Sequence, residues 1–236
     1  MASQKSTAHW AGLIYLIVVI SGVVSLMYVP SELYDWNDAP QTVQNIKTSK
    51  LLFKIGAVSG LICYVDFIFL PLVLFKLLQS VDRTHGVLMV VLAITSVPIS
   101  LVAVSNLFSV LDVLGDSGHY VALSGNYRQA MVMSSLDAYY NGIHVSQVFW
   151  GLWLFPFGYL VYKSGFLPKV LGVFLMIGCF GYIIAFLGGT FFPGYHDTWF
   201  ATLVGIPDSI GEIGICLWLL IKGVKDGPKT EKNETT

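Results

Sequence analysis

The sequence predicts an all-α integral membrane protein, a bundle of six transmembrane helices whose two termini both lie in the cytoplasm. Two observations carry the fold class. Hydrophobic residues make up 55% of the chain and charged residues only 11%, against roughly 25% charged residues in a soluble domain. The apolar residues also gather in six blocks, each long enough to cross a hydrocarbon core of roughly 30 Å, which takes a helix of about 20 residues. The alternation typical of barrel strands is absent from these blocks.

The expected spans cover the six apolar blocks at residues 10–29, 51–78, 87–111, 138–162, 170–192 and 199–221. The first block carries no charge and runs into Pro30 without a small-residue cleavage site, so we expect a retained helix and not a signal peptide. Residues 1–224 are expected to form a single transmembrane domain, followed by a disordered basic tail at 225–236. The second, fourth and sixth spans each end at a lysine, which three helical hairpins would explain. Snorkelling lysines produce the same ending in unrelated helices.

The orientation follows from the basic residues near the span ends, which are enriched on the cytoplasmic side. The side shared by the two termini carries Lys5, Lys76, Arg83, Lys163, Lys169, Lys222, Lys225, Lys229 and Lys232. The opposite side carries Lys47, Lys50, Lys54 and Arg128. On that opposite side we expect two long loops, residues 30–50 and 112–137, of which the second is predicted to contain a short helix lying on the surface. That helix is either a lid over a cavity or a simple connector.

Composition also excludes several classes of function. The net charge is −1 and basic residues are few, so nucleic acid is not an expected partner. Cys63, Cys179 and Cys216 lie singly inside apolar blocks with no nearby histidine, which indicates neither a disulfide framework nor a zinc site. We therefore expect no metal and no cofactor. The expected partners are the lipid bilayer and a small molecule or cation, and the sequence does not define the oligomeric state.

Three acidic residues lie well inside the predicted spans, namely Asp66, Asp208 and Glu212. An ionised acid at a helix centre costs roughly 2.5 to 3.5 kcal/mol on the insertion scale, so these side chains are expected to face other helices or water. Asp208 and Glu212 are four residues apart and share one helical face. Asp66 and Glu212 each precede a terminal lysine by ten residues, which puts both roughly 15 Å from the cytoplasmic end, near the midplane.

The remaining polar candidates in the spans are Asn106, Asn141 and His144. With so few cations available, desolvation favours neutral carboxyls, or a His144 cation beside one ionised acid. Pro207 directly precedes Asp208, and the kink it introduces would shape a polar cavity or simply help the helices to pack. The alternative for all of these residues is structural, with the acids acting as hydrogen-bond donors that fix helix packing. We expect the glycines of the fifth span, Gly178 and Gly188 among them, to allow close helix contact.

Two segments resemble a known family. Residues 149–172 read FWGLWLFPFGYLVYKSGFLPKVLG, a long aromatic run joined to a turn, and Glu212 is followed at residues 218–223 by WLLIKG. Both are similar to a bacterial multi-pass membrane family known as domain of unknown function 4386. The resemblance covers nearly the whole chain and implies a six-helix protein of the bacterial cytoplasmic membrane. It implies no reaction, because the family has no assigned catalytic residues.

Three functions remain open at this point. The first is a small-molecule or ion- or proton-coupled transporter that uses Asp66, Asp208 and Glu212 as proton or cation sites, with His144 as a partner. The second is a membrane-embedded enzyme that modifies lipids, with Asp208, Glu212 and His144 as an acid–base site. The third is a non-catalytic scaffold or regulatory subunit. Whether the protein is an enzyme is therefore uncertain from sequence.

Overall fold

The computed structural model describes residues 4–115 and 119–224, and within them all regular structure is helical. The prediction of an all-α fold is confirmed. The elements are α1 (Gln4–Val23), the π-helix η1 (Val24–Tyr28), α2 (Val29–Leu33), α3 (Ala39–Thr48), α4 (Lys50–Leu78), α5 (Arg83–Val113), the 3₁₀-helix η2 (His119–Ala122), α6 (Gly125–Lys163), α7 (Lys169–Phe191), the 3₁₀-helix η3 (Tyr195–Asp197), α8 (Trp199–Val204) and α9 (Ile206–Ile221). The basic tail predicted for 225–236 lies outside the described residues.

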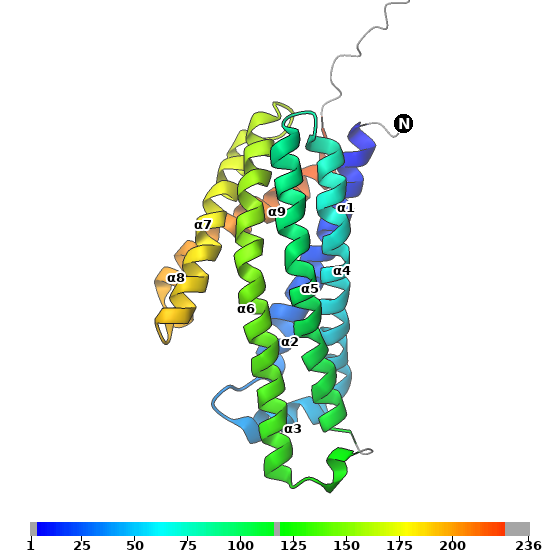
Figure 1. Ribbon diagram of the computed structural model, residues 1–236, viewed down its shortest axis with the longest axis vertical. Coiled ribbons are helices and arrows are strands. Elements are labelled where there is room, and N and C mark those ends of the chain that lie inside the picture. Colours follow the sequence, from blue (N-terminus) through cyan, green and yellow to red (C-terminus); the bar gives the residue numbers. More distant parts are fainter. Residues whose placement is uncertain (1–3, 116–118, 225–236) are drawn as a thin grey trace, which may run out of the picture.

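The long helices form a closed bundle. Each of α1, α4, α5, α6, α7 and α9 contacts the next along the chain, and α9 returns to α1 (Figure 1). The contacts between α4 and α5 and between α6 and α7 fall within the range of those inside the expected hairpins, so the bundle does not separate into three pairs. The His9 ring nitrogen Nδ1 lies 2.9 Å from the carbonyl oxygen of Leu220, so the two ends of the described chain meet at one end of the bundle.

Five segments in the described part of the chain are long and apolar enough to cross a membrane. They are Gln4–Leu33, Lys50–Leu78, Arg83–Val113, Lys169–Phe191 and Trp199–Ile221. The fourth expected span, 138–162, falls in α6 and is not among them. Its apolar residues alternate with Trp and Tyr, and Asn141, His144 and Gln147 lie near its start, so its mean hydropathy is lower. Large apolar side chains point outward along the five segments, with Leu51 72% exposed, as expected of helices that can sit in lipid.

Glycines set how closely the helices approach. A Cβ atom on Gly178 of α7 would lie 2.8 Å from the Cα of Asp208, and one on Gly181 would lie 2.8 Å from the carbonyl oxygen of Val204. The expectation that the glycines of this span permit close helix contact is therefore confirmed for these positions. Where α9 returns to α1, a Cβ atom on Gly12 would overlap the backbone nitrogen of Leu220. Small residues of this kind let helix backbones pack closely.

The loop expected at 112–137 is largely helical, but not as a separate surface helix. Residues 125–137 form the first turns of α6, so the predicted short surface helix is corrected to a helix extension. Arg128 on these turns donates hydrogen bonds from Nε (2.9 Å) and Nη2 (2.7 Å) to the carbonyl oxygen of Val113, and a third from Nη2 to Gly115. The arginine therefore caps the last carbonyls of α5 and ties them to α6.

The turn between α4 and α5 is built around Asp82. Its carboxylate accepts a hydrogen bond from the backbone N–H of His85 at 3.1 Å and lies 3.0 Å from the His85 ring, which stacks on Tyr159 of α6. The hydrogen bond from the His85 backbone, helped by the His85 ring, holds the pKa of the Asp82 carboxyl below its usual value. An ionised cap at this position favours the start of α5.

The crossing of α1 and α9 closes the bundle, and its close approach can be tested by adding one methyl group at Gly12. We expect Gly12→Ala to lower the free energy of unfolding in detergent by about 1 to 3 kcal/mol, because the Cβ meets backbone and not a movable side chain. The matched control is Gly125→Ala, since nothing lies within 4 Å of a Cβ at that position. Equal thermal unfolding midpoints for the two variants would contradict the crossing.

Candidate functional site

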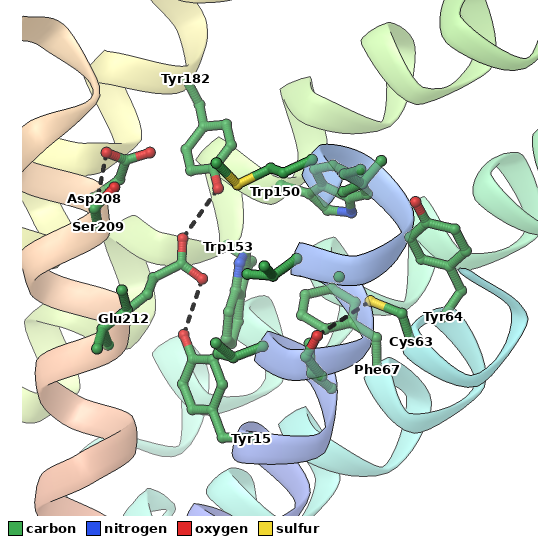
Figure 2. Close-up of a pocket in the computed structure, with 17 residues that line it drawn as sticks. Tyr15, Cys63, Tyr64, Phe67, Trp150, Trp153, Tyr182, Asp208, Ser209 and Glu212 are labelled. Carbon is green, nitrogen blue, oxygen red and sulfur yellow. Dashed lines mark hydrogen bonds between the residues drawn. The ribbon is translucent and has the colours of Figure 1, made fainter. Parts of the chain in front are cut away.

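A cavity of about 290 Å³ lies inside the bundle, between α1, η1, α4, α6, α7 and α9. Figure 2 shows its lining, which is mostly apolar and aromatic around two carboxylates, those of Asp208 and Glu212. The volume is close to the lower end of the range for small-molecule sites, roughly 300 to 1,000 Å³. The cavity therefore has the size and the composition of a site for a small ligand.

Helical spacing explains which side chains face the cavity. On α1 and η1 the lining positions include Tyr15, Val19, Gly22 and Leu26, which are three or four residues apart and so share one face. The same rule brings Asp208 and Glu212 of the last span to the cavity together, as their spacing predicts.

Glu212 is the central polar group of the cavity. The hydroxyl of Tyr15 donates a hydrogen bond to its Oε2 at 3.0 Å, and the hydroxyl of Tyr182 donates one to its Oε1 at 3.1 Å (Figure 2). The first tyrosine comes from α1 and the second from α7, so the carboxyl links both helices to α9. The only carboxylate ion pair that the described residues form is Asp82 with His85, so Glu212 has no cationic partner among them.

Asp208 lies where the sixth expected span is broken. The span consists of α8 and α9, which meet at Gly205, and Pro207 occupies the first turn of α9. The interruption predicted at Pro207 is therefore present as a helix break. Asp208 Oδ1 accepts a hydrogen bond from the backbone N–H of Ser209 at 2.9 Å, and the Ser209 hydroxyl donates to the carbonyl oxygen of Gly205 at 2.9 Å. These side-chain bonds add to the backbone hydrogen bond of 3.5 Å between the Ser209 N–H and the Gly205 carbonyl oxygen at the start of α9.

Aromatic rings form most of the remaining wall. Trp150 stacks on Tyr64 with ring centroids 5.9 Å apart and planes 21° from parallel. Trp153 meets Phe67 edge to face at 5.2 Å and lies 6.4 Å from the ring of Tyr15. Because each ring is held by another ring, the wall is rigid and its side chains have few alternative rotamers.

The other predicted polar residues lie elsewhere. Asp66 is on α4 between the lining residues Tyr64 and Phe67 but is not part of the lining. Asn106 lines a groove between α5 and α6, and its side-chain amide donates to the carbonyl oxygens of Val102 and Ala103.

His144 and Asn141 line a second pocket on α6, together with Gln147 and His196. His144 Nε2 lies 3.2 Å from the Thr190 hydroxyl, and its ring stacks on Phe186. The structure thus brings Asp208 and Glu212 to one cavity, whereas it puts Asp66, Asn106, Asn141 and His144 outside it.

Sequence reasoning missed the two tyrosines that hold Glu212. Tyrosine within an apolar block was treated as part of the block, or as an interfacial residue, because Trp and Tyr gather at membrane surfaces. Tyr15 and Tyr182 instead lie near the middle of their helices, about as far from the helix ends as Glu212. A tyrosine far from both ends of an apolar block is a signal that would have included them, together with Tyr64 of α4.

The chemistry of this site is limited by its residues. A carboxylate held by two phenols can exchange a proton or bind a cation, and the lining offers apolar contact to an organic molecule. No group of three or more His, Cys, Asp or Glu side chains within the described ranges is arranged to hold a metal ion. The fold and this cavity define a helical bundle of the membrane-protein type with an internal carboxylate site.

Comparison with known proteins agrees with this class. The model of the family described as "Domain of unknown function (DUF4386)" matches residues 10–223, and the chain belongs to this family. A relative from Archaeoglobus fulgidus, described as an uncharacterized protein, is 38% identical over 90 residues. That match covers 38% of this chain and 51% of the relative, so the chain spans about half of the relative's length. No solved structure matches the chain.

The hydrogen bonds to Glu212 can be tested by infrared spectroscopy. We expect the carboxyl band that disappears in Glu212→Gln to shift in frequency in both Tyr15→Phe and Tyr182→Phe, because each variant removes one donor and keeps the ring. Tyr127→Phe serves as the control, since Tyr127 is 58% exposed and distant from the cavity. A band that stays unchanged in both cavity variants would contradict the observed hydrogen bonds.

Proposed function

We propose that α6 supplies a sixth membrane crossing and that residues 1–224 form one transmembrane domain with cytoplasmic termini. The contact between His9 and Leu220 supports an even number of crossings, since both chain ends then lie on one side. The second half of α6 runs beside α7, with His144 next to Thr190 near one end and Gly158 against Gly172 near the other. The basic residues at the shared end support a cytoplasmic side. The family resemblance supports a bacterial cytoplasmic membrane as the location.

Single cysteines test this topology in a variant that lacks the three native cysteines. With a membrane-impermeant maleimide, we expect Asn37→Cys and Asp197→Cys to react in intact cells. Ser80→Cys and Lys169→Cys should react only after permeabilisation, because their turns would face the cytoplasm. If α6 did not cross, Lys169→Cys and Ser80→Cys would differ in their labelling, and that result would exclude the six-span topology.

We propose that the protein is a transporter that moves a small molecule or ion in exchange with, or together with, protons, and that Glu212 is the exchanging group. The observation that carries this proposal is a half-buried carboxyl that lines a cavity inside the bundle and has no cationic partner in the described chain. Removing an ion from water costs several kcal/mol unless it is paired. A group in this situation is neutralised by a proton or by a bound cation, and alternation between the two is the basis of coupled transport.

The proposed cycle uses the bonds that Glu212 makes. When Glu212 is charged, both tyrosine hydroxyls donate to it and hold α1 and α7 against α9. A proton or a cation on the carboxyl weakens these bonds, so the helices are freer to separate. The π-helix η1 contributes Leu26 and Met27 to the cavity lining, and the break at Gly205 lies three residues before the lining residue Asp208. Interrupted helices of this kind form binding sites in transporters. Asp208, one turn away, adds negative charge on the same face.

A lipid-modifying enzyme is the alternative, and one observation favours it. Part of the cavity rim is exposed on the outside of the bundle, where lipid would lie. The lining contains Asp208 and Glu212 but no histidine, and its one thiol, Cys63, lies 3.5 Å from the carbonyl oxygen of Val18. Conversion of a labelled phospholipid by the purified protein would favour the enzyme, and co-purification of a partner without flux would favour a scaffold.

Proton flux in proteoliposomes tests the transporter proposal. With a pH-sensitive dye inside, an imposed pH gradient, and Na⁺, K⁺ and tetramethylammonium present as candidate coupled ions, we expect the wild-type protein to dissipate the gradient faster than protein-free liposomes do. Glu212→Gln should fall to the protein-free rate, because the amide cannot carry the proton. Glu32→Gln is the matched control, since Glu32 is exposed and is not part of the cavity lining. Equal rates for Glu212→Gln and wild type would overturn the proposal.

A further inference from the structure

We propose that the cavity binds an amphiphilic organic cation, an ammonium group with an apolar body, which enters sideways from the bilayer. The inference rests on the proposed function and names its substrate class. Three features of the cavity carry it, namely the unpaired carboxyl, the aromatic wall and the exposed rim.

The Glu212 carboxylate and the aromatic wall together indicate which head group of a ligand the cavity would bind. Glu212 offers a negative charge, and each of its oxygens accepts one tyrosine bond and keeps a lone pair for a ligand. Trp150, Trp153 and Tyr64 supply aromatic rings around the same space. A carboxylate combined with aromatic rings is the arrangement that recognises ammonium groups, because the ring faces attract a cation and tolerate its alkyl substituents.

The lining disfavours an inorganic cation. Such ions require several oxygen ligands, six to eight for Ca²⁺ and six for Mg²⁺. Apart from the tyrosine hydroxyls, the side-chain oxygens of this cavity come from Asp208, Ser209 and Glu212 of α9 alone. The remainder of the wall is apolar or aromatic, which suits the hydrocarbon part of an organic ligand.

The rim defines the route of entry. Val23 and Met27 on the first span are 47% and 65% exposed, and Ile213 on α9 is 48% exposed, yet all three line the cavity. Helix α9 runs obliquely and meets α1 near the end with both termini (Figure 1), whereas η1 packs on α4. The opening therefore lies on the outer wall of the bundle, where the surrounding helix surface is apolar. A ligand that arrives from lipid through this opening carries an apolar body with its charge.

Binding to the purified full-length protein in lipid nanodiscs tests the inference without any gradient. The probe is benzyltrimethylammonium, and the matched control ligand is neopentylbenzene, which has the same shape and no charge. We expect saturable binding of the cation, measured by calorimetry and by a change in tryptophan fluorescence, and no saturable binding of the neutral compound. Dodecyltrimethylammonium should compete, because its long tail can extend through the rim.

Variants separate the two recognition elements. We expect Glu212→Gln to weaken binding at least roughly 10-fold through loss of the charge. Trp150→Leu should weaken it roughly 3-fold or more through loss of one aromatic face. The control variants are Glu32→Gln and Trp199→Leu, which change an exposed acid and a tryptophan that is 78% exposed. Both should bind benzyltrimethylammonium as the wild type does. A cooperative thermal unfolding transition in each cavity variant will show that the variant is folded.

The outcomes distinguish the organic-cation inference from the transporter proposal. Equal binding of the charged and neutral ligands, or no binding of either, would overturn the organic-cation inference while proton flux could still support transport. Binding of the cation that is insensitive to both Glu212→Gln and Trp150→Leu would also overturn it, because the site would then lie elsewhere. Binding of benzyltrimethylammonium without competition by dodecyltrimethylammonium would overturn the sideways entry. Cation binding without any proton flux would support the site and reject the transporter.

Discussion

The carboxyl of Glu212 is the group around which the interior is arranged. A charge without an ion-pair partner inside a bundle is destabilising by several kcal/mol, and hydrogen bonds recover only part of that cost. Tyr15 and Tyr182 provide these bonds from two different helices. The carboxyl that makes α9 costly to bury therefore also fixes the position of α9 against α1 and α7. Close packing at Gly12 and Gly178 makes the short distances possible. The polar centre and the small-residue crossings therefore depend on each other.

The irregular parts of the helices lie at the cavity and not at random positions. The first span changes to a π-helix where Leu26 and Met27 line the cavity, and the last span breaks at Gly205, three residues before Asp208. In a membrane, irregular backbone is tolerated only where other groups satisfy it or where it lines a cavity. At the second break the Ser209 hydroxyl donates a hydrogen bond to the carbonyl oxygen of Gly205, which also accepts one from the Ser209 backbone N–H.

The fold was largely accessible from sequence, and the site was only partly so. Apolar runs fix where helices form, and the four-residue spacing fixed the shared face of Asp208 and Glu212, because both depend on local geometry. The partners of Glu212 depend instead on how α1 and α7 are rotated against α9, which no local pattern encodes, so His144 was favoured as the available cation while two tyrosines counted as apolar. Local pattern also did not predict where α6 begins. The helix includes thirteen polar-rich residues, 125–137, and Arg128 among them bonds to the end of α5.

The cavity itself argues against a purely structural carboxyl. If a space of about 290 Å³ were closed and empty, the lost packing at roughly 24 cal/mol per Å³ would approach 7 kcal/mol, comparable to the whole stability of many domains. A carboxyl needed only to fix helix packing could be satisfied by its two tyrosines in a filled interior, with no such space beside it. The rim at Val23 and Ile213 removes part of the cost by admitting lipid or water, and it does so on the side where Glu212 keeps acceptor capacity. An opening, a space and a carboxyl without an ion-pair partner in one place are together better explained by a transient occupant than by packing.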